Sequence, residues 1–139
     1  MGARVEVSEE KHPPSNPLTQ PFWEATRKHK FVMQRCSSCK RFHWLPVPRC
    51  QTCGGDLEWE ELSGKGSVYT YTVVNRAVRN KLFADKIPYL VAMVELDEGP
   101  RFIAPVQTKD LEKVRIGTKV EVTFEDVDAE TSLPRFKLA

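Results

Sequence analysis

The chain has 139 residues, 40% of them hydrophobic, and its 21 Lys and Arg residues nearly balance its 19 Asp and Glu residues, for a formal net charge of +2. These values are typical of a globular domain and exclude a disordered chain. The longest uninterrupted apolar run, residues 89–94, is far shorter than the roughly 20 residues that cross a bilayer. The sequence therefore predicts a protein without a membrane span.

The first residues and the cysteines indicate the compartment. Residues 1–11 carry several charged side chains and no apolar segment follows them, so we expect no signal peptide and a cytoplasmic location. In a reducing compartment, the four cysteines are better interpreted as metal ligands or reactive thiols than as disulfides.

The chain divides into four consecutive segments. Residues 1–18 are rich in proline and are predicted to form an extended arm. Residues 19–31 are predicted to form a short helix, because Pro21 suits its first turn and Arg27 and Lys28 suit its C-terminal end. Residues 32–58 contain every cysteine and are expected to form a compact metal-binding module. Residues 59–139 are expected to form a separate β domain.

In this last segment the apolar period is two, which is typical of half-buried strands. Strands are predicted over residues 66–74, 90–96 and 119–124, with two more over residues 101–106 and 135–138. About five short strands without a strong helix pattern favour a small closed barrel of the OB type. The predicted fold class is mainly β, with a short N-terminal helix, a metal module and a C-terminal five-stranded OB-type barrel.

The strongest motif is a pair of C-x-x-C sequences separated by ten residues. The two-residue gap allows both sulfurs of a pair to reach one metal about 2.3 Å away, while the turn directs backbone N–H groups at the thiolates. Gly54 permits the positive φ that often closes such a turn. We expect one structural Zn²⁺, and its four ligands are Cys36, Cys39, Cys50 and Cys53.

Two disulfides, or an iron bound as in rubredoxin, are the alternatives to zinc. A metal with four protein ligands has no open position for water, so the expected ion is structural and not hydrolytic. His29 and His43 lie near the cysteines but are surplus to a four-thiolate site. A surface or capping role is expected for both.

No arrangement of residues predicts catalysis by this chain alone. Once the cysteines bind metal, no thiol nucleophile remains, and His12, His29 and His43 all lie outside the predicted barrel. The sequence contains no nucleophile elbow and no Walker loop. The chain is therefore expected to bind rather than to catalyse.

Two groups of residues are candidates for binding. The first is a basic set between the first two long strands, where an OB barrel often places a ligand-contacting loop: Arg76, Arg79, Lys81 and Lys86. It contacts phosphate or is a solvated loop. The second is an apolar set in the N-terminal third: Phe22, Trp23, Phe31, Phe42 and Trp44. This set packs on the barrel or forms a partner interface.

Several short strings carry a family resemblance. They are Pro21-Phe22-Trp23, the two cysteine pairs with Pro48-Arg49 before the second, residues 64–74, Pro88-Tyr89, residues 94–101, Ile116-Gly117, and residues 120–122 and 133–136. In this order they resemble a family of small proteins with an N-terminal helix, a rubredoxin-like zinc ribbon and a C-terminal OB-fold, long known as a domain of unknown function and associated with acyl-CoA metabolism. One departure is Lys40-Arg41 after the first cysteine pair, where glycine is common.

The resemblance implies a non-catalytic accessory subunit of a thiolase-superfamily complex. Such proteins scaffold a thiolase, a condensing enzyme or a thiolase-like aldolase, in some complexes with a hydratase, and two copies of each subunit are one arrangement. The partner would supply the catalytic residues and bind acyl-CoA. The zinc ligands carry over to the four cysteines, and the basic set becomes a candidate for contacts to the phosphates of CoA.

A single-stranded nucleic-acid binder is the main alternative, because zinc ribbons and OB-folds both serve that function. Residues 20–55 support it with seven basic residues and one acid. Residues 56–139 oppose it with 12 basic and 15 acidic residues, since such a binder normally carries its positive groove on the barrel.

Overall fold

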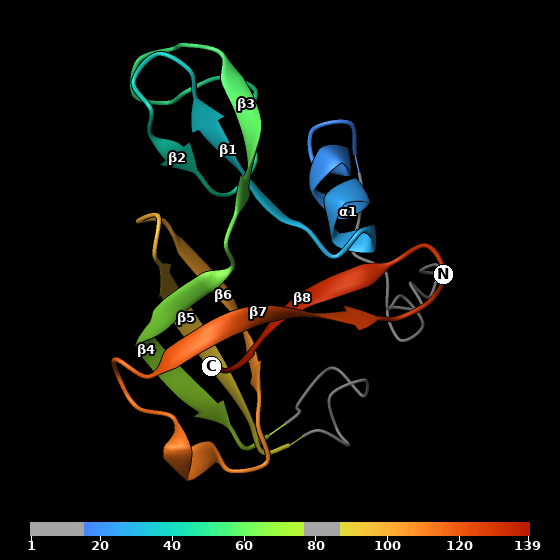
Figure 1. Ribbon diagram of the computed structural model, residues 1–139, viewed down its shortest axis with the longest axis vertical. Coiled ribbons are helices and arrows are strands. Elements are labelled where there is room, and N and C mark those ends of the chain that lie inside the picture. The colour runs from blue at the N-terminus through green and yellow to red at the C-terminus, as the bar shows by residue number, and fades with distance from the viewer. Residues whose placement is uncertain (1–15, 77–86) are drawn as a thin grey trace, which may run out of the picture.

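The computed structural model describes residues 16–76 and 87–139. A helix and a small sheet lie at one end of the molecule, and a barrel lies at the other (Figure 1). The elements in chain order are α1 (Gln20–Arg27), β1 (Phe31–Cys36), β2 (Phe42–His43), β3 (Leu57–Leu62), β4 (Lys65–Val74), β5 (Tyr89–Leu96), β6 (Arg101–Gln107), the 3₁₀-helix η2 (Leu111–Lys113), β7 (Lys119–Asp126) and β8 (Ser132–Leu138). No helix in these two ranges is long and apolar enough to cross a membrane.

Helix α1 is shorter than the 19–31 segment predicted from the sequence, because His29 ends it. His29 has a left-handed backbone, with φ of 56°. Its N–H donates to the carbonyl of Thr26, and the N–H of Lys30 donates to that of Ala25. This is the Schellman arrangement that usually contains glycine. The His29 ring stacks on Phe124 and lies 2.8 Å from the Asp126 carboxylate, which ties the helix end to strand β7.

The cysteine module is a three-stranded antiparallel sheet in the order β2-β1-β3. Strand β3 pairs with β1 from Phe31↔Leu62 to Cys36↔Leu57, so this sheet extends slightly beyond the expected 32–58. The buried Gln34 holds the Pro46-Val47-Pro48 elbow, because its amide donates to the carbonyl of Val47 and accepts from the N–H of Val47. The Gln34 side chain thereby satisfies both backbone hydrogen-bonding groups of Val47, as a neighbouring strand would do.

Strands β4 to β8 form a closed barrel in the order β4-β5-β6-β8-β7, which confirms the predicted five-stranded OB-type barrel. The alternation predicted for β5 is also present, since Leu90, Ala92, Val94 and Leu96 are all buried. Strands β6 and β8 are parallel and pair only at Val106↔Phe136 and Gln107↔Lys137. The barrel is therefore closed by a short seam, and side chains must fill the space beside it.

Aromatic side chains from the helix and the ribbon pack beside this seam. Phe102 of β6 lies with its ring centroid 4.9 Å from that of Phe31 and 4.8 Å from that of Trp44, and Phe22 contacts all three rings. Phe136 lies behind Phe102 at 6.2 Å. We call these five residues the junction cluster. It joins the ribbon and the barrel into one core.

The junction cluster decides between the two roles considered for the N-terminal aromatic residues. Phe22 and Phe31 are each only 2% exposed, so they pack on the barrel and are not available to a partner. Trp23, Phe42 and Trp44 are half-buried and pack against the same core. The expectation of a partner interface is therefore wrong for Phe22 and Phe31, because the barrel offers the apolar surface that they need.

Candidate metal centre

The two C-x-x-C turns bring four sulfurs together at the tip of the ribbon. The sulfur atoms of Cys36, Cys39, Cys50 and Cys53 all lie within 4.8 Å of one another. The Sγ atoms of Cys36 and Cys53 are 3.4 Å apart, and those of Cys39 and Cys50 are 3.6 Å apart. Four sulfurs around a tetrahedral zinc at about 2.3 Å would be separated by roughly 3.8 Å. The sulfur positions therefore fit a single zinc ion.

The two turns have the same backbone conformation, although their sequences differ. Lys40 follows the first pair with φ of 66°, and Gly54 follows the second with φ of 74°. The N–H of Lys40 donates to the carbonyl of Cys36, and that of Gly54 donates to the carbonyl of Cys50. The expectation of a positive φ at Gly54 is confirmed. Lys40 adopts the same conformation without the freedom of glycine, so the departure from the family pattern leaves the turn intact.

Hydrogen bonds around the sulfurs favour thiolates at two positions. The backbone N–H of Cys39 lowers the pKa of the Cys36 thiol, although burial raises it. The backbone N–H of Cys53 lowers the pKa of Cys50 to about 5 against the effect of burial, with further contributions from Thr52 and His43.

The environment of Cys53 disfavours its ionised form, in contrast to Cys36 and Cys50. The N–H of Gly55 lowers its pKa, but the neighbouring sulfurs of Cys36 and Cys39 raise the pKa to about 11. Four thiolates at these distances repel one another strongly. A bound dication removes that repulsion, and metal binding is therefore coupled to loss of protons and to folding.

His43 lies beside the cysteines and outside the set of four. Its Nε2 atom is 3.2 Å from the Sγ of Cys50. A thiolate can only accept a hydrogen bond, so Nε2 carries the proton when Cys50 is ionised. Sequence reasoning assigned His43 a surface or capping role and missed this contact. The strand pairing Gln34↔His43 between β1 and β2 produces it, and the cysteine spacing alone gives no signal for it.

The predicted basic set lies mostly outside the described residues. Arg76 is exposed just after strand β4. Arg79, Lys81 and Lys86 fall within residues 77–86, which the structure does not describe. The proposed contacts to CoA phosphates therefore stay a prediction.

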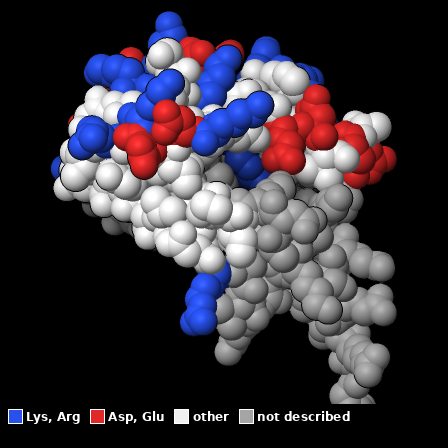
Figure 2. Space-filling model, turned by 90° about the horizontal axis from the view of Figure 1, so that it is seen from below, with Lys and Arg blue, Asp and Glu red and all other residues white. Residues whose placement is uncertain are grey.

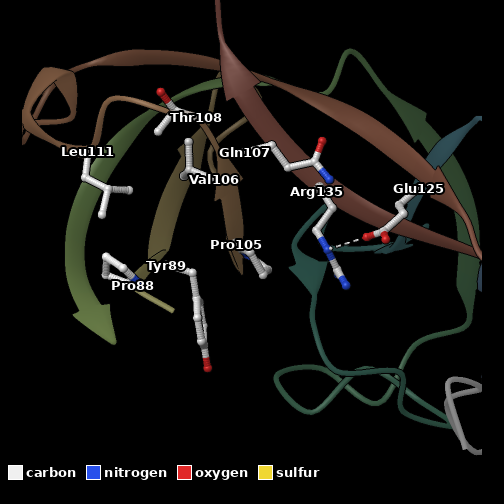
Figure 3. Close-up of a pocket in the computed structure, with 9 residues that line it drawn as sticks. All are labelled: Pro88, Tyr89, Pro105, Val106, Gln107, Thr108, Leu111, Glu125 and Arg135. Atoms are coloured by element: carbon white, nitrogen blue, oxygen red, sulfur yellow. Dashed lines mark ion pairs between the residues drawn. The ribbon is translucent and has the colours of Figure 1, made fainter. Parts of the chain in front are cut away.

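A cavity of about 160 Å³ lies on the barrel, away from the cysteines. Tyr89 and Pro105 line one part of it, and Arg135 reaches into it from β8 (Figure 3). The Arg135 side chain is only 15% exposed; its Nε lies 3.4 Å from a carboxylate oxygen of Glu125, and its Nη1 donates to the carbonyl of Pro134. Burial lowers the pKa of this guanidinium, and Glu125 opposes that shift. Sequence reasoning noted Arg135 only as part of a family string.

The ribbon and the barrel each match a family model. Residues 23–60 match the rubredoxin-like zinc ribbon domain of ChsH2, and residues 59–125 match the C-terminal OB-fold domain of ChsH2. The chain belongs to the ChsH2 family. The resemblance found in the sequence is thereby confirmed, and the four cysteines are the metal ligands of a structural zinc ribbon.

Curated relatives of this ChsH2-family chain include longer proteins. It is 36% identical over 121 residues to a probable enoyl-CoA hydratase alpha subunit from Thermomonospora curvata, a match that covers 85% of this chain and 37% of that protein. It is 39% identical over 92 residues to a DUF35 domain-containing scaffold protein from Methanocaldococcus jannaschii, covering 65% of this chain and 64% of that protein. The chain thus spans less than two thirds of either relative.

A solved structure matches more completely. A chain of the Ltp2-ChsH2(DUF35) aldolase superposes with a TM-score of 0.82 at 34% sequence identity, covering 91% of this ChsH2-family chain and 98% of that chain. The arrangement of helix, ribbon and barrel is therefore shared with a chain of the solved structure named Ltp2-ChsH2(DUF35) aldolase.

Proposed function

We propose that this ChsH2-family chain is a non-catalytic accessory subunit of a thiolase-superfamily complex that acts on acyl-CoA. The observation that carries the proposal is the near-complete match to a chain of the Ltp2-ChsH2(DUF35) aldolase. The name of the Methanocaldococcus relative, a scaffold protein, agrees with a subunit that organises a partner.

The chemistry of the chain supports the same role. The one cluster of metal-binding residues in the described part of the chain is the four-cysteine set, and four protein ligands leave no position for a substrate or water. When bound, the zinc supplies folding energy to the ribbon. The four cysteines hold it, His43 donates to one thiolate, and the junction cluster fixes the ribbon on the barrel.

Acyl-CoA would meet the partner's catalytic residues at or near this subunit. Arg76, Arg79, Lys81 and Lys86 are proposed to contribute phosphate contacts, because cationic side chains bind phosphate oxygens strongly. A hydratase is a further proposed partner, since relatives carry hydratase alpha subunit names.

Co-purification tests the proposal directly. The tagged chain is purified from its native cells at moderate salt, the proteins recovered with it are identified, and zinc is measured in the same sample. We expect a thiolase-like protein at near-equal stoichiometry and one zinc per chain. Recovery of RNA or DNA that is lost at high salt, without such an enzyme, would instead support the nucleic-acid binder.

A further inference from the structure

The two ends of the molecule are organised differently. At the barrel end, Lys and Arg side chains lie beside Asp and Glu side chains on the described surface (Figure 2), so opposite charges there offset one another. At the ribbon end, three consecutive residues connect the four sulfurs with the hydrophobic core. They are Phe42 and His43, which form β2, and Trp44, which follows it.

His43 and Trp44 contact different parts of the molecule. The Nε2 atom of His43 lies 3.2 Å from the Sγ of Cys50. The ring centroid of Trp44 lies 4.8 Å from that of Phe22 and 4.8 Å from that of Phe102. Adjacent residues of an extended segment point to opposite sides, and here one residue contacts a metal ligand while the next packs in the junction cluster.

The loop of residues 43–50 lies between these contacts and is restrained at three points. The imidazole–sulfur contact joins its two ends, which are seven residues apart in the sequence. Its middle is held by the buried Gln34, whose amide makes hydrogen bonds of 3.0 and 2.8 Å with the backbone of Val47. Near its start, Trp44 packs on the barrel. The position of Trp44 therefore depends on where the loop holds Cys50.

The contact between His43 and Cys50 is a hydrogen bond to a metal ligand. A thiolate accepts hydrogen bonds and cannot donate one, so the imidazole supplies the N–H of this contact. Hydrogen bonds to an ionised acceptor are roughly twice as strong as those between neutral groups. Groups that hydrogen-bond to metal ligands typically change the metal affinity by about 10–100-fold. His43 is therefore placed to strengthen zinc binding and to hold the end of the 43–50 loop.

We propose that His43 is a positioning residue that couples zinc binding to the packing of Trp44 in the junction cluster. The metal fixes Cys50, the His43 N–H fixes the start of the 43–50 loop on Cys50, and the loop fixes Trp44. Such coupling is reciprocal, so packing of Trp44 favours zinc binding by the same factor by which zinc favours that packing. The inference concerns contacts within the chain and is independent of the proposed accessory role.

Zinc affinities of the full-length chain test the coupling. Each variant competes for zinc with a chromophoric chelator of known affinity, and the competition gives the dissociation constant. His43→Phe keeps an aromatic ring but removes the donor, so its dissociation constant for zinc is expected to rise about 10–100-fold. His43→Gln replaces the ring N–H with an amide N–H and is expected to recover most of that loss.

A second variant changes a side chain that packs on the barrel. Trp44→Leu is expected to raise the dissociation constant for zinc by about fivefold or more, because coupling between two sites is typically of that size. Trp23→Leu is the matched control. Trp23 is also half-buried and packs on Phe22 with ring centroids 4.9 Å apart, but it belongs to α1. It is expected to bind zinc like wild type, which separates the coupling from a general loss of stability.

The double variant decides whether His43 carries the coupling. If it does, His43→Phe combined with Trp44→Leu should bind zinc as weakly as His43→Phe alone, because Trp44 is already disconnected from the metal site. Fold-changes that multiply in the double variant would overturn the inference. Equal zinc affinity of His43→Phe and wild type would also overturn it.

Cobalt(II) bound in place of zinc separates the hydrogen bond from simple space filling. Its complex with four thiolates absorbs light by charge transfer from sulfur to metal. Loss of the N–H donor leaves the Cys50 sulfur richer in electrons, so the absorption of His43→Phe should shift to lower energy, whereas that of His43→Gln should stay close to wild type. An unshifted absorption in His43→Phe would assign His43 a space-filling role and overturn the inference.

Discussion

The ribbon and the barrel are adjacent in sequence but are stabilised in different ways. Most of the buried hydrophobic side chains lie in the barrel, where strands β4 to β8 close on one another. The ribbon buries Phe31, Met33 and Leu62, has one strand of only two residues, and brings four sulfurs together at its tip. The barrel therefore follows ordinary core packing, whereas the ribbon needs a metal at one end and the barrel at the other.

This difference indicates how the two parts cooperate. A metal site fixes the tip of the ribbon, and the junction cluster fixes its base against Phe102. The ribbon and the barrel therefore share one continuous core. A preformed arrangement of the two parts lowers the entropic cost of binding a partner, which suits an accessory subunit.

Removal of one zinc ligand should have the largest effect, and that effect should be confined to the ribbon. In Cys36→Ser, we expect loss of zinc and unfolding of the ribbon, because zinc binding supplies about 10 kcal/mol or more of folding free energy in small zinc domains. The barrel should keep its β-sheet signals, since its strands pair among themselves. Zinc analysis and two-dimensional NMR of the same sample measure both parts. Retained zinc at one ion per chain would contradict the four-cysteine assignment.

Truncation in the junction cluster should affect both parts together. Phe31 is 2% exposed and packs edge-to-face on Phe102, so Phe31→Ala should lower the free energy of unfolding by about 3–5 kcal/mol. Denaturant unfolding measures the loss. Phe42→Ala is the control, because Phe42 is only half-buried on the ribbon and should cost less. An equal loss in the two variants would show that the cluster has no special role in joining the parts.

The smallest effect concerns the two turns of the ribbon. Lys40 holds a left-handed conformation that glycine adopts without strain, so Lys40→Gly should stabilise the zinc-bound ribbon by up to about 1 kcal/mol. The reverse change, Gly54→Ala, should destabilise it by a similar amount, and nothing within 4 Å of the new Cβ would add a steric cost. Thermal unfolding in excess zinc compares them. A loss of stability in Lys40→Gly would mean that the Lys40 side chain outweighs its backbone strain.

Local patterns in the sequence predicted the five barrel strands and the grouping of the four cysteines. The spacing of the cysteines and the alternation of β5 both involve residues that are close in the sequence, so both could be predicted without knowledge of the fold. The role of the N-terminal aromatic residues could not be predicted in this way. Phe22 and Phe31 are buried by Phe102, which lies some 70 or more residues further along the chain, and the sequence left packing and partner binding equally open.

Two further features depended on context in the same way. The end of α1 at His29 follows a backbone conformation that histidine rarely adopts, and contacts with Phe124 and Asp126 of the barrel accompany it. The cavity around Arg135 requires Tyr89, Pro105 and Glu125 to meet from three other strands. Contacts between residues so far apart in the sequence leave no short-range pattern from which they could be predicted.

The junction cluster also sets an order of events during synthesis of the protein. Ribosomes add about 5–20 residues per second, so Phe22 and Phe31 are exposed for several seconds before Phe102 and Phe136 have been made. The four zinc ligands lie between positions 36 and 53 and can bind their ion during that interval. During that interval the four cysteines are available to zinc while Phe22 and Phe31 are still exposed. The junction cluster can form only after Phe102 and Phe136 have been synthesised.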